Sequence, residues 1–324
     1  MSEIDPERSV PDLLQEINDW TYIAQEAKWI APSLPKQKEI IQSIQDLSAA
    51  ALERLKVPEP PPVEEPPGEP PPPQRSRVRG NFPGVLYGNG QRNWVNILEP
   101  ADGGLDSPCC VVIHGGGLRP MPGVSGLVPP EVTQFLLNQG YVVCEVAYPY
   151  SNGYPEVCVA AIVKFLYWLS ERYQQYGIDG GRVLLIGHSA GGWLAVRAAM
   201  HPEAPIPKGV LGLAPAWLHV EADTWLPPMT ESITLQAWGY DRAQWDNYSP
   251  HTHMEERAER CAIWLVHGAN DDQIPYQMSQ RFQQDAGQHG WWCGLNVVPG
   301  GDHFSVGHPA NYNTYELLRE LRDA

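Results

Sequence analysis

Residues 182–192, Arg-Val-Leu-Leu-Ile-Gly-His-Ser-Ala-Gly-Gly, decide the fold of this chain. The apolar, β-branched run at their start is typical of a buried strand, and Trp193 to Met200 predicts a helix. Ser189 therefore lies on the turn between a strand and a helix, at the positive end of the helix dipole, where developing negative charge is favoured. The flanking glycines fit this turn, because it leaves almost no room for side chains.

A second glycine-rich segment, His114-Gly115-Gly116-Gly117, directly follows a strand expected at residues 108–113. Glycines let a substrate carbonyl approach the backbone closely, so amides in such a loop can stabilise an oxyanion. The segment is a candidate partner for Ser189 in acyl transfer.

Expected strands and helices alternate from residue 81 onward. Strands are expected at 84–87, 94–98, 108–113, 141–146, 182–186, 208–213, 261–266 and 292–298, and helices at 131–138, 155–176, 193–200, 275–288 and 309–323. The first two strands are short and are expected at an edge. Such alternation specifies an α/β protein with a mainly parallel sheet covered on both faces.

With these motifs, the sequence resembles the α/β-hydrolase superfamily, in its esterase/lipase branch that carries an His-Gly-Gly-Gly motif. The resemblance covers residues 81–324 of the 324. Asn247-Tyr248-Ser249-Pro250 resembles a segment of kynurenine formamidase-like and related carboxylesterases, which places the chain in that neighbourhood of the superfamily. The resemblance implies an α/β-hydrolase fold with a small aromatic-rich cap at about residues 215–260, and an oxyanion hole made by the amides of Gly115, Gly116 and Ala190.

The resemblance also implies the partners of Ser189. The loop after the strand at 261–266 is similar to the family's acid loop, and its spacing selects Asp271 over the neighbouring Asp272. His303 follows the last strand, where the family places its histidine; His308 is an alternative. Ser189, Asp271 and His303 occur in the chain order that this fold requires, each after a strand. They are therefore the expected nucleophile, acid and base.

The aromatic side chains of the cap have two interpretations. Trp217, Trp225, Trp238, Tyr240, Trp245, Tyr248 and Met229 all lie in this segment. They could line an acyl or aryl pocket, or they could hold a small helical cap together.

The amino-acid composition narrows the kinds of partner, cellular location and metal site to be expected for this chain. The net charge of −16 argues against nucleic acid or an anionic membrane as a partner. No apolar run is long enough for a membrane span and the N-terminus does not resemble a signal peptide, so a cytoplasmic location is expected. The six cysteines lack metal-site spacing and are expected as free thiols. His251 and His253 lack partners that would complete a metal site, so neither a metal nor a cofactor is expected.

The first quarter of the chain has a different character. Residues 12–30 and 36–56 predict two helices that form a hairpin, and residues 58–80 begin with a Pro/Glu-rich run that predicts an extended linker. The expected domains are therefore residues 1–57, 58–80 and 81–324. The hairpin either caps the catalytic domain or self-associates, or it docks another protein through residues 12–56.

The expected function is cofactor-independent hydrolysis of carboxylic esters with small or medium acyl groups through an acyl-enzyme. A small-molecule amide is the alternative substrate, as in an arylformamidase. The alternative of another class is a binding protein built on a hydrolase scaffold.

Overall fold

The computed structural model describes residues 80–90, 92–101, 103, 106–120, 130–307 and 314–323. The chain divides into two units, Met1–Arg75 and Ser76–Ala324, and all described residues belong to the second. The predicted helical hairpin at 12–56, nearly all of the linker at 58–80 and the alternative base His308 lie outside the described residues.

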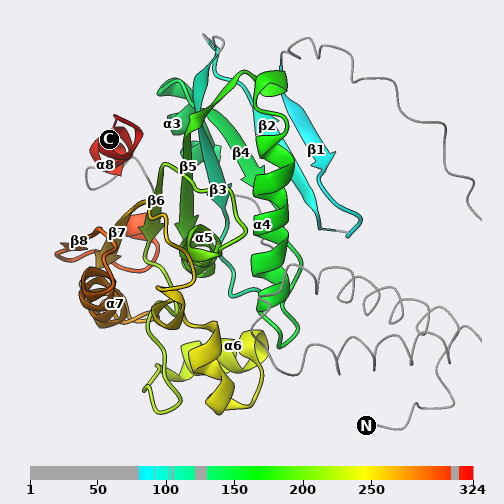
Figure 1. The fold of residues 1–324 in the computed structure, drawn as a ribbon. Helices are drawn as coiled ribbons and strands as arrows, with labels where there is room; N and C mark the ends of the chain where they lie inside the picture. The colour runs from blue at the N-terminus through cyan, green and yellow to red at the C-terminus, as the bar shows by residue number, and fades with distance from the viewer. Residues whose placement is uncertain are drawn as a thin grey trace, which may run out of the picture. The chain divides into compact units, whose positions relative to one another are not determined.

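One sheet of eight strands forms the centre of the described part of the chain (Figure 1). The strands are β1 (Phe82–Leu86), β2 (Trp94–Leu98), β3 (Ser107–Ile113), β4 (Val142–Val146), β5 (Ile178–His188), β6 (Gly209–Leu213), β7 (Ala262–Gly268) and β8 (Cys293–Val298). Their order is β1-β2-β4-β3-β5-β6-β7-β8. The pairs β1–β2 and β2–β4 are antiparallel and the others are parallel. The predicted mainly parallel sheet is confirmed.

The expectation that both early strands lie at an edge is wrong for β2. It pairs with β1 on one side and with β4 on the other, so only β1 of the two is an edge strand. The burial of β2 explains this position, because Val95 and Ile97 are fully buried and face the core. β1 carries an exposed Leu86 at its end.

Helices cover both faces of the sheet (Figure 1). They are α3 (Pro130–Asn138), α4 (Glu156–Ser170), α5 (Ala190–Met200), α6 (Pro228–Trp238), α7 (Gln277–Gln288) and α8 (Thr314–Asp323). Val132 and Leu136 of α3 and Leu318 of α8 pack against buried residues of β3 to β6. α4 and α5 lie together at the front in Figure 1, joined by a buried ion pair between Glu156 and Arg197 at 3.3 Å.

The helix expected over 155–176 is shorter in the structure. α4 ends at Ser170, where the amide of Arg172 bonds back to Leu169 in a tighter turn. A short 3₁₀-helix, η2 (Gln174–Tyr176), follows and Gly177 adopts a left-handed conformation with φ 63°. This glycine ends the helical segment and directs the chain into β5, which begins four residues earlier than expected.

The segment between β6 and β7 forms a small cap of α6 and two 3₁₀-helices, η3 (Arg242–Tyr248) and η4 (Pro250–His253). Trp217, Trp238 and Trp245 are fully buried there, and Trp193 of α5 packs edge-on against Trp217 with ring centroids 6.2 Å apart. These indoles therefore hold the cap together and fix it to α5. Trp225, Met229 and Tyr240 are exposed instead.

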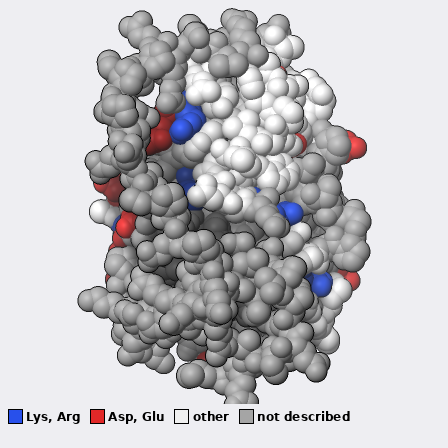
Figure 2. All heavy atoms as spheres, turned by 90° about the vertical axis from the view of Figure 1, so that its right-hand side faces the viewer, with Lys and Arg blue, Asp and Glu red and all other residues white. Residues whose placement is uncertain are grey.

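The described residues on the β1 side of the molecule are mostly uncharged. Figure 2 shows this side, where most of the described atoms belong to uncharged residues. All six cysteines are free, and five of them are buried. Among the described helices, none has the length and apolar character needed to cross a membrane.

Candidate active site

Ser189 occupies a strained turn at the carboxyl end of β5. Its φ of 55° and ψ of −122° lie in a region that residues with a side chain rarely adopt. Hydrogen bonds to neighbouring segments stabilise this strained conformation. The amide of Ser189 donates to the carbonyl of Leu213 in β6, and the carbonyl of Ser189 accepts from the amide of Ala216. A Cβ on Gly191 would lie 2.1 Å from the carbonyl oxygen of Ile113, so this position admits only glycine.

The structure brings Ser189, His303 and Asp271 together. The hydroxyl of Ser189 lies 3.0 Å from Nε2 of His303, and Nδ1 of the same ring lies 2.8 Å from Oδ2 of Asp271. A carboxylate only accepts hydrogen bonds, so Nδ1 carries the proton and donates it to Asp271. Nε2 then has a free lone pair that accepts the hydrogen bond of the serine. This arrangement can remove the proton from Ser189 as its oxygen attacks.

The side chain of Asp271 is fully buried and receives hydrogen bonds from several directions. Oδ1 accepts the amides of Gln273 and Ile274 at 3.0 and 2.8 Å. Oδ2 lies 2.8 Å from His303 and 3.2 Å from Nε2 of His267. Burial alone would raise the pKa of this carboxyl, but the hydrogen bonds of His267 and His303 outweigh it and hold the pKa well below its ordinary value. The carboxyl therefore remains ionised beside His303.

The neighbouring acidic residues do not contact the base. Asp272, the rival on the acid loop, is exposed. Asp302 accepts the amides of Phe304 and Ser305 within its own turn. Of these three carboxylates, only that of Asp271 is hydrogen-bonded to the imidazole of His303.

The His-Gly-Gly-Gly segment lies against the serine turn. A Cβ on Gly115 would be 3.2 Å from the Cβ of Ser189, so a side chain there would crowd the nucleophile. Tyr148 donates its hydroxyl to the carbonyl of His114 at 2.7 Å and its ring stacks on that imidazole, which fixes the loop. In the described part of the chain the amides of Gly115 and Gly116 donate no hydrogen bond to the protein. They are free to bind an oxyanion.

Ala190 supplies a third candidate amide. It is the first residue of α5, where backbone amides have no partner within the helix. Its amide follows the serine directly, at the helix N-terminus, where the dipole favours a developing negative charge.

Two histidines that sequence reasoning left without a site role support the base and the acid. His188 donates from Nε2 to the backbone carbonyl of His303 at 2.8 Å. His267 is fully buried, lies 2.8 Å from Ser279 through Nδ1, and reaches Ile274 and Asp271 through Nε2. Because Ile274 and Asp271 offer only acceptors, Nε2 of His267 is the protonated nitrogen. The only sequence signal for these roles is their place next to Ser189 and at the start of the acid loop.

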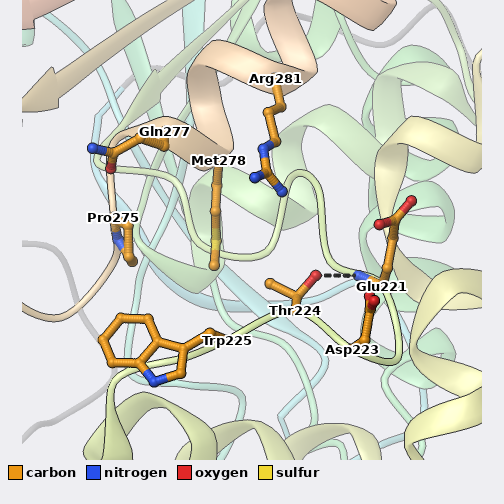
Figure 3. Close-up of a pocket in the computed structure, with 8 residues that line it drawn as sticks. All are labelled: Glu221, Asp223, Thr224, Trp225, Pro275, Gln277, Met278 and Arg281. Carbon is orange, nitrogen blue, oxygen red and sulfur yellow. Dashed lines mark hydrogen bonds between the residues drawn. The ribbon is translucent and has the colours of Figure 1, made fainter.

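A pocket of about 540 Å³ lies beside Pro275, at the end of the acid loop (Figure 3), and Ser189 is not among the residues that line it. It is lined by Glu221, Asp223, Thr224, Trp225, Pro275, Gln277, Met278 and Arg281. Arg281 and Met278 point into it from α7, and the exposed indole of Trp225 forms part of its wall. Among the cap aromatics only Trp225 lines this pocket, and the triad does not line it, so an aromatic acyl or aryl pocket stays a prediction.

Comparison with known proteins agrees with the geometry. The prolyl oligopeptidase family matches residues 131–322, a range that includes Ser189, Asp271 and His303. No curated protein matches the chain.

Solved structures share the fold at low identity. A truncated carbohydrate esterase from gut microbiota superposes with a TM-score of 0.61 at 15% identity, covering 78% of this chain and 99% of its own. Esterase B from Lactobacillus Rhamnosis gives 0.60 at 22% identity, with 74% and 83% covered. Propionate-bound esterase Est2 from Thermogutta terrifontis gives 0.55 at 21% identity, with 78% and 94% covered.

The matched range, the serine turn after β5 and the mainly parallel sheet agree with one another. The chain belongs to the prolyl oligopeptidase family, and it is a serine hydrolase with the α/β-hydrolase fold.

Proposed function

We propose that this protein hydrolyses carboxylic esters of small or medium acyl groups through an acyl-enzyme on Ser189. The observation that carries the proposal is the continuous chain from the Ser189 hydroxyl through His303 to the buried carboxylate of Asp271, at 3.0 and 2.8 Å. Each group in this chain is already oriented for proton transfer, so little reorganisation accompanies the attack.

In this mechanism Ser189 Oγ attacks the ester carbonyl while Nε2 of His303 takes its proton. The amides of Gly115, Gly116 and Ala190 hold the oxyanion that forms. Asp271 stabilises the imidazolium by accepting its Nδ1 hydrogen. The imidazolium then gives the proton to the leaving alcohol, and a water molecule, activated by the same ring, releases the acid and restores Ser189.

Ester specificity draws support from the structural neighbours, which are esterases, one of them seen with bound propionate and another form with butyrate. Both ligands are short carboxylates, which favours small acyl groups for this chain as well. The family match favours a second candidate, an amide bond, because the family is named for an oligopeptidase. The same triad cleaves either bond, and the groups around the scissile bond determine which.

The test is a p-nitrophenyl ester series from acetate to decanoate, alongside N-formylkynurenine and a prolyl p-nitroanilide. The Ser189→Ala protein serves as the blank. A maximum of kcat/KM at short or medium esters supports the proposal, and a maximum at either amide transfers the assignment to amide hydrolysis. Undiminished turnover by Ser189→Ala, or no reaction of the wild type with a fluorophosphonate, would overturn the mechanism.

A further inference from the structure

Two histidines and a glutamate converge away from the serine, where the chain after β6 meets η4 and α7. One nitrogen each of His219 and His251 and one carboxylate oxygen of Glu221 all lie within 4.8 Å of one another. Nε2 of His219 is 3.9 Å from Oε1 of Glu221, and the two imidazole rings stack with centroids 4.2 Å apart. These three side chains are called the His–His–Glu cluster below.

The outer nitrogen of His219 fixes its tautomer. Nδ1 lies 2.7 Å from Oδ2 of Asp285 on α7. Since a carboxylate only accepts, Nδ1 carries a hydrogen, so Nε2, on the side of Glu221, is the nitrogen that remains to bind a metal ion.

The tautomer of His251 follows from counting the hydrogen bonds of Ser249. The Ser249 hydroxyl donates its single hydrogen to the carbonyl of Trp217 and accepts the amide of Val220. Nδ1 of His251, 2.9 Å from the same oxygen, must therefore be the donor. This leaves Nε2 of His251 with a lone pair.

The His–His–Glu cluster thus places one nitrogen of each imidazole and one carboxylate oxygen within 4.8 Å of one another. The two stacked rings lie nearly parallel, with 20° between their planes, so they must tilt for both nitrogens to face one ion. Two imidazoles and a carboxylate suit Zn²⁺ and related divalent ions. Outer hydrogen bonds from Nδ1 to a carboxylate and a hydroxyl are the usual support of histidine ligands at metal sites.

We propose that His219, His251 and Glu221 bind one Zn²⁺ ion, with Asp285 and Ser249 orienting the two imidazoles. Metal–ligand distances of about 2.0–2.2 Å place the donors of a tetrahedral site about 3.4 Å apart, so donors spaced by up to 4.8 Å must close by as much as about 1.4 Å. Glu221 can supply that movement, because its side chain is 51% exposed. A fourth position would remain for water.

The ion would have a structural role. It would join the segment at 219–221 to η4, with α7 behind it, and Glu221 also lines the pocket of Figure 3. The proposal departs from the sequence-based expectation of no metal, which considered His251 with His253. In the structure both nitrogens of His253 are occupied, by Glu256 and by the carbonyl of Asn247.

The experiment titrates chelator-treated full-length protein with Zn²⁺ by calorimetry and with Co²⁺ by visible absorption. We expect one site, and a rise in Tm of about 5–10 °C at a Zn²⁺ concentration 100-fold above Kd. His251→Gln should weaken the site at least 100-fold and Glu221→Gln at least tenfold. Glu221→Gln preserves shape at an exposed position, so its folding is secure.

His253→Gln is the matched control, because it lies two residues from His251 in η4 but outside the cluster. It should bind as the wild type does, and so should Ser189→Ala, which separates this proposal from the catalytic one. Absence of a tight site in the wild type, or equal affinities in His251→Gln and His253→Gln, would overturn the proposal.

Discussion

The imidazole of His188 donates a hydrogen bond to the backbone carbonyl of His303 at 2.8 Å, although 115 residues separate them in the chain. The two rings also pack at a centroid distance of 4.9 Å. The residue that precedes the serine therefore holds the loop that carries the proposed base. His188 acts through His303 and is a positioning residue.

Replacing His188 by Phe should lower kcat by about 10- to 100-fold with little change in KM. The ring remains, but the hydrogen bond that places His303 is lost, and a misplacement on the order of 1 Å costs about that much. His188→Gln keeps a donor and should recover part of the loss. Steady-state kinetics on the best ester would measure both, and a Phe variant with wild-type kcat would refute the positioning role.

Stability should fall as the pH is lowered from 6.5 toward 4. Burial lowers the pKa of His114 and of His188 from 6.5 to about 4. In that window the unfolded chain binds protons that these two rings in the folded protein do not, so acid favours unfolding. The slope is about 1.4 kcal/mol per pH unit for each ring at most.

Urea denaturation at pH 4.5, 5.5 and 6.5 would measure this slope. His188→Phe removes one of these groups and should flatten the profile. An unchanged slope in that variant would show that other groups cause the pH dependence.

Ser189→Gly should be more stable than Ser189→Ala by about 1–2 kcal/mol. Both variants lack the hydroxyl of the proposed nucleophile, but only glycine adopts the φ of 55° and ψ of −122° without strain. Chemical denaturation would measure the free energy of unfolding of each variant. Because both lack the Ser189 hydroxyl, the comparison does not depend on activity. Equal stabilities would mean that the turn is not strained.

Gly191→Ala should destabilise the protein by several kcal/mol, because its Cβ would overlap the carbonyl of Ile113. Gly287→Ala is the matched control in α7, where a Cβ meets no atom within 4 Å. It should stabilise by about 0.5–1 kcal/mol, since alanine favours a helix. Thermal or urea unfolding of both variants would check the pair, and a mild effect at 191 would contradict the packing.

The sequence predicts the sheet and the turn at Ser189 because a strand followed by a glycine-rich turn indicates its own structure. The grouping of Asp271 and His303 with Ser189 is what the resemblance to the α/β-hydrolase family implies, through its loops and their chain order. The end of α4 at Ser170 was missed because no glycine or proline marks it. The internal position of β2 was missed because its partner β4 lies more than 40 residues away.

The supporting histidines and the His–His–Glu cluster could not be predicted for a related reason. The partners of His188, His219 and His251 come from distant segments, and their spacing in the chain carries no signal. His251 and His253 lie two residues apart in η4, yet their side chains hydrogen-bond to different residues, Ser249 and Glu256. The tautomer of a histidine is inferred from the hydrogen-bond partners of its two ring nitrogens, which the sequence does not show.

The position of β8 has a consequence for biosynthesis. It pairs with β7 alone at one edge of the described sheet, and His303 follows it. A nascent chain that has left the ribosome up to the end of α7 contains Ser189, the glycine loop and Asp271, but not His303, the proposed base. Under the proposed mechanism, hydrolytic activity begins only when His303 is added after β8, so we expect an incomplete chain to be inactive while it folds.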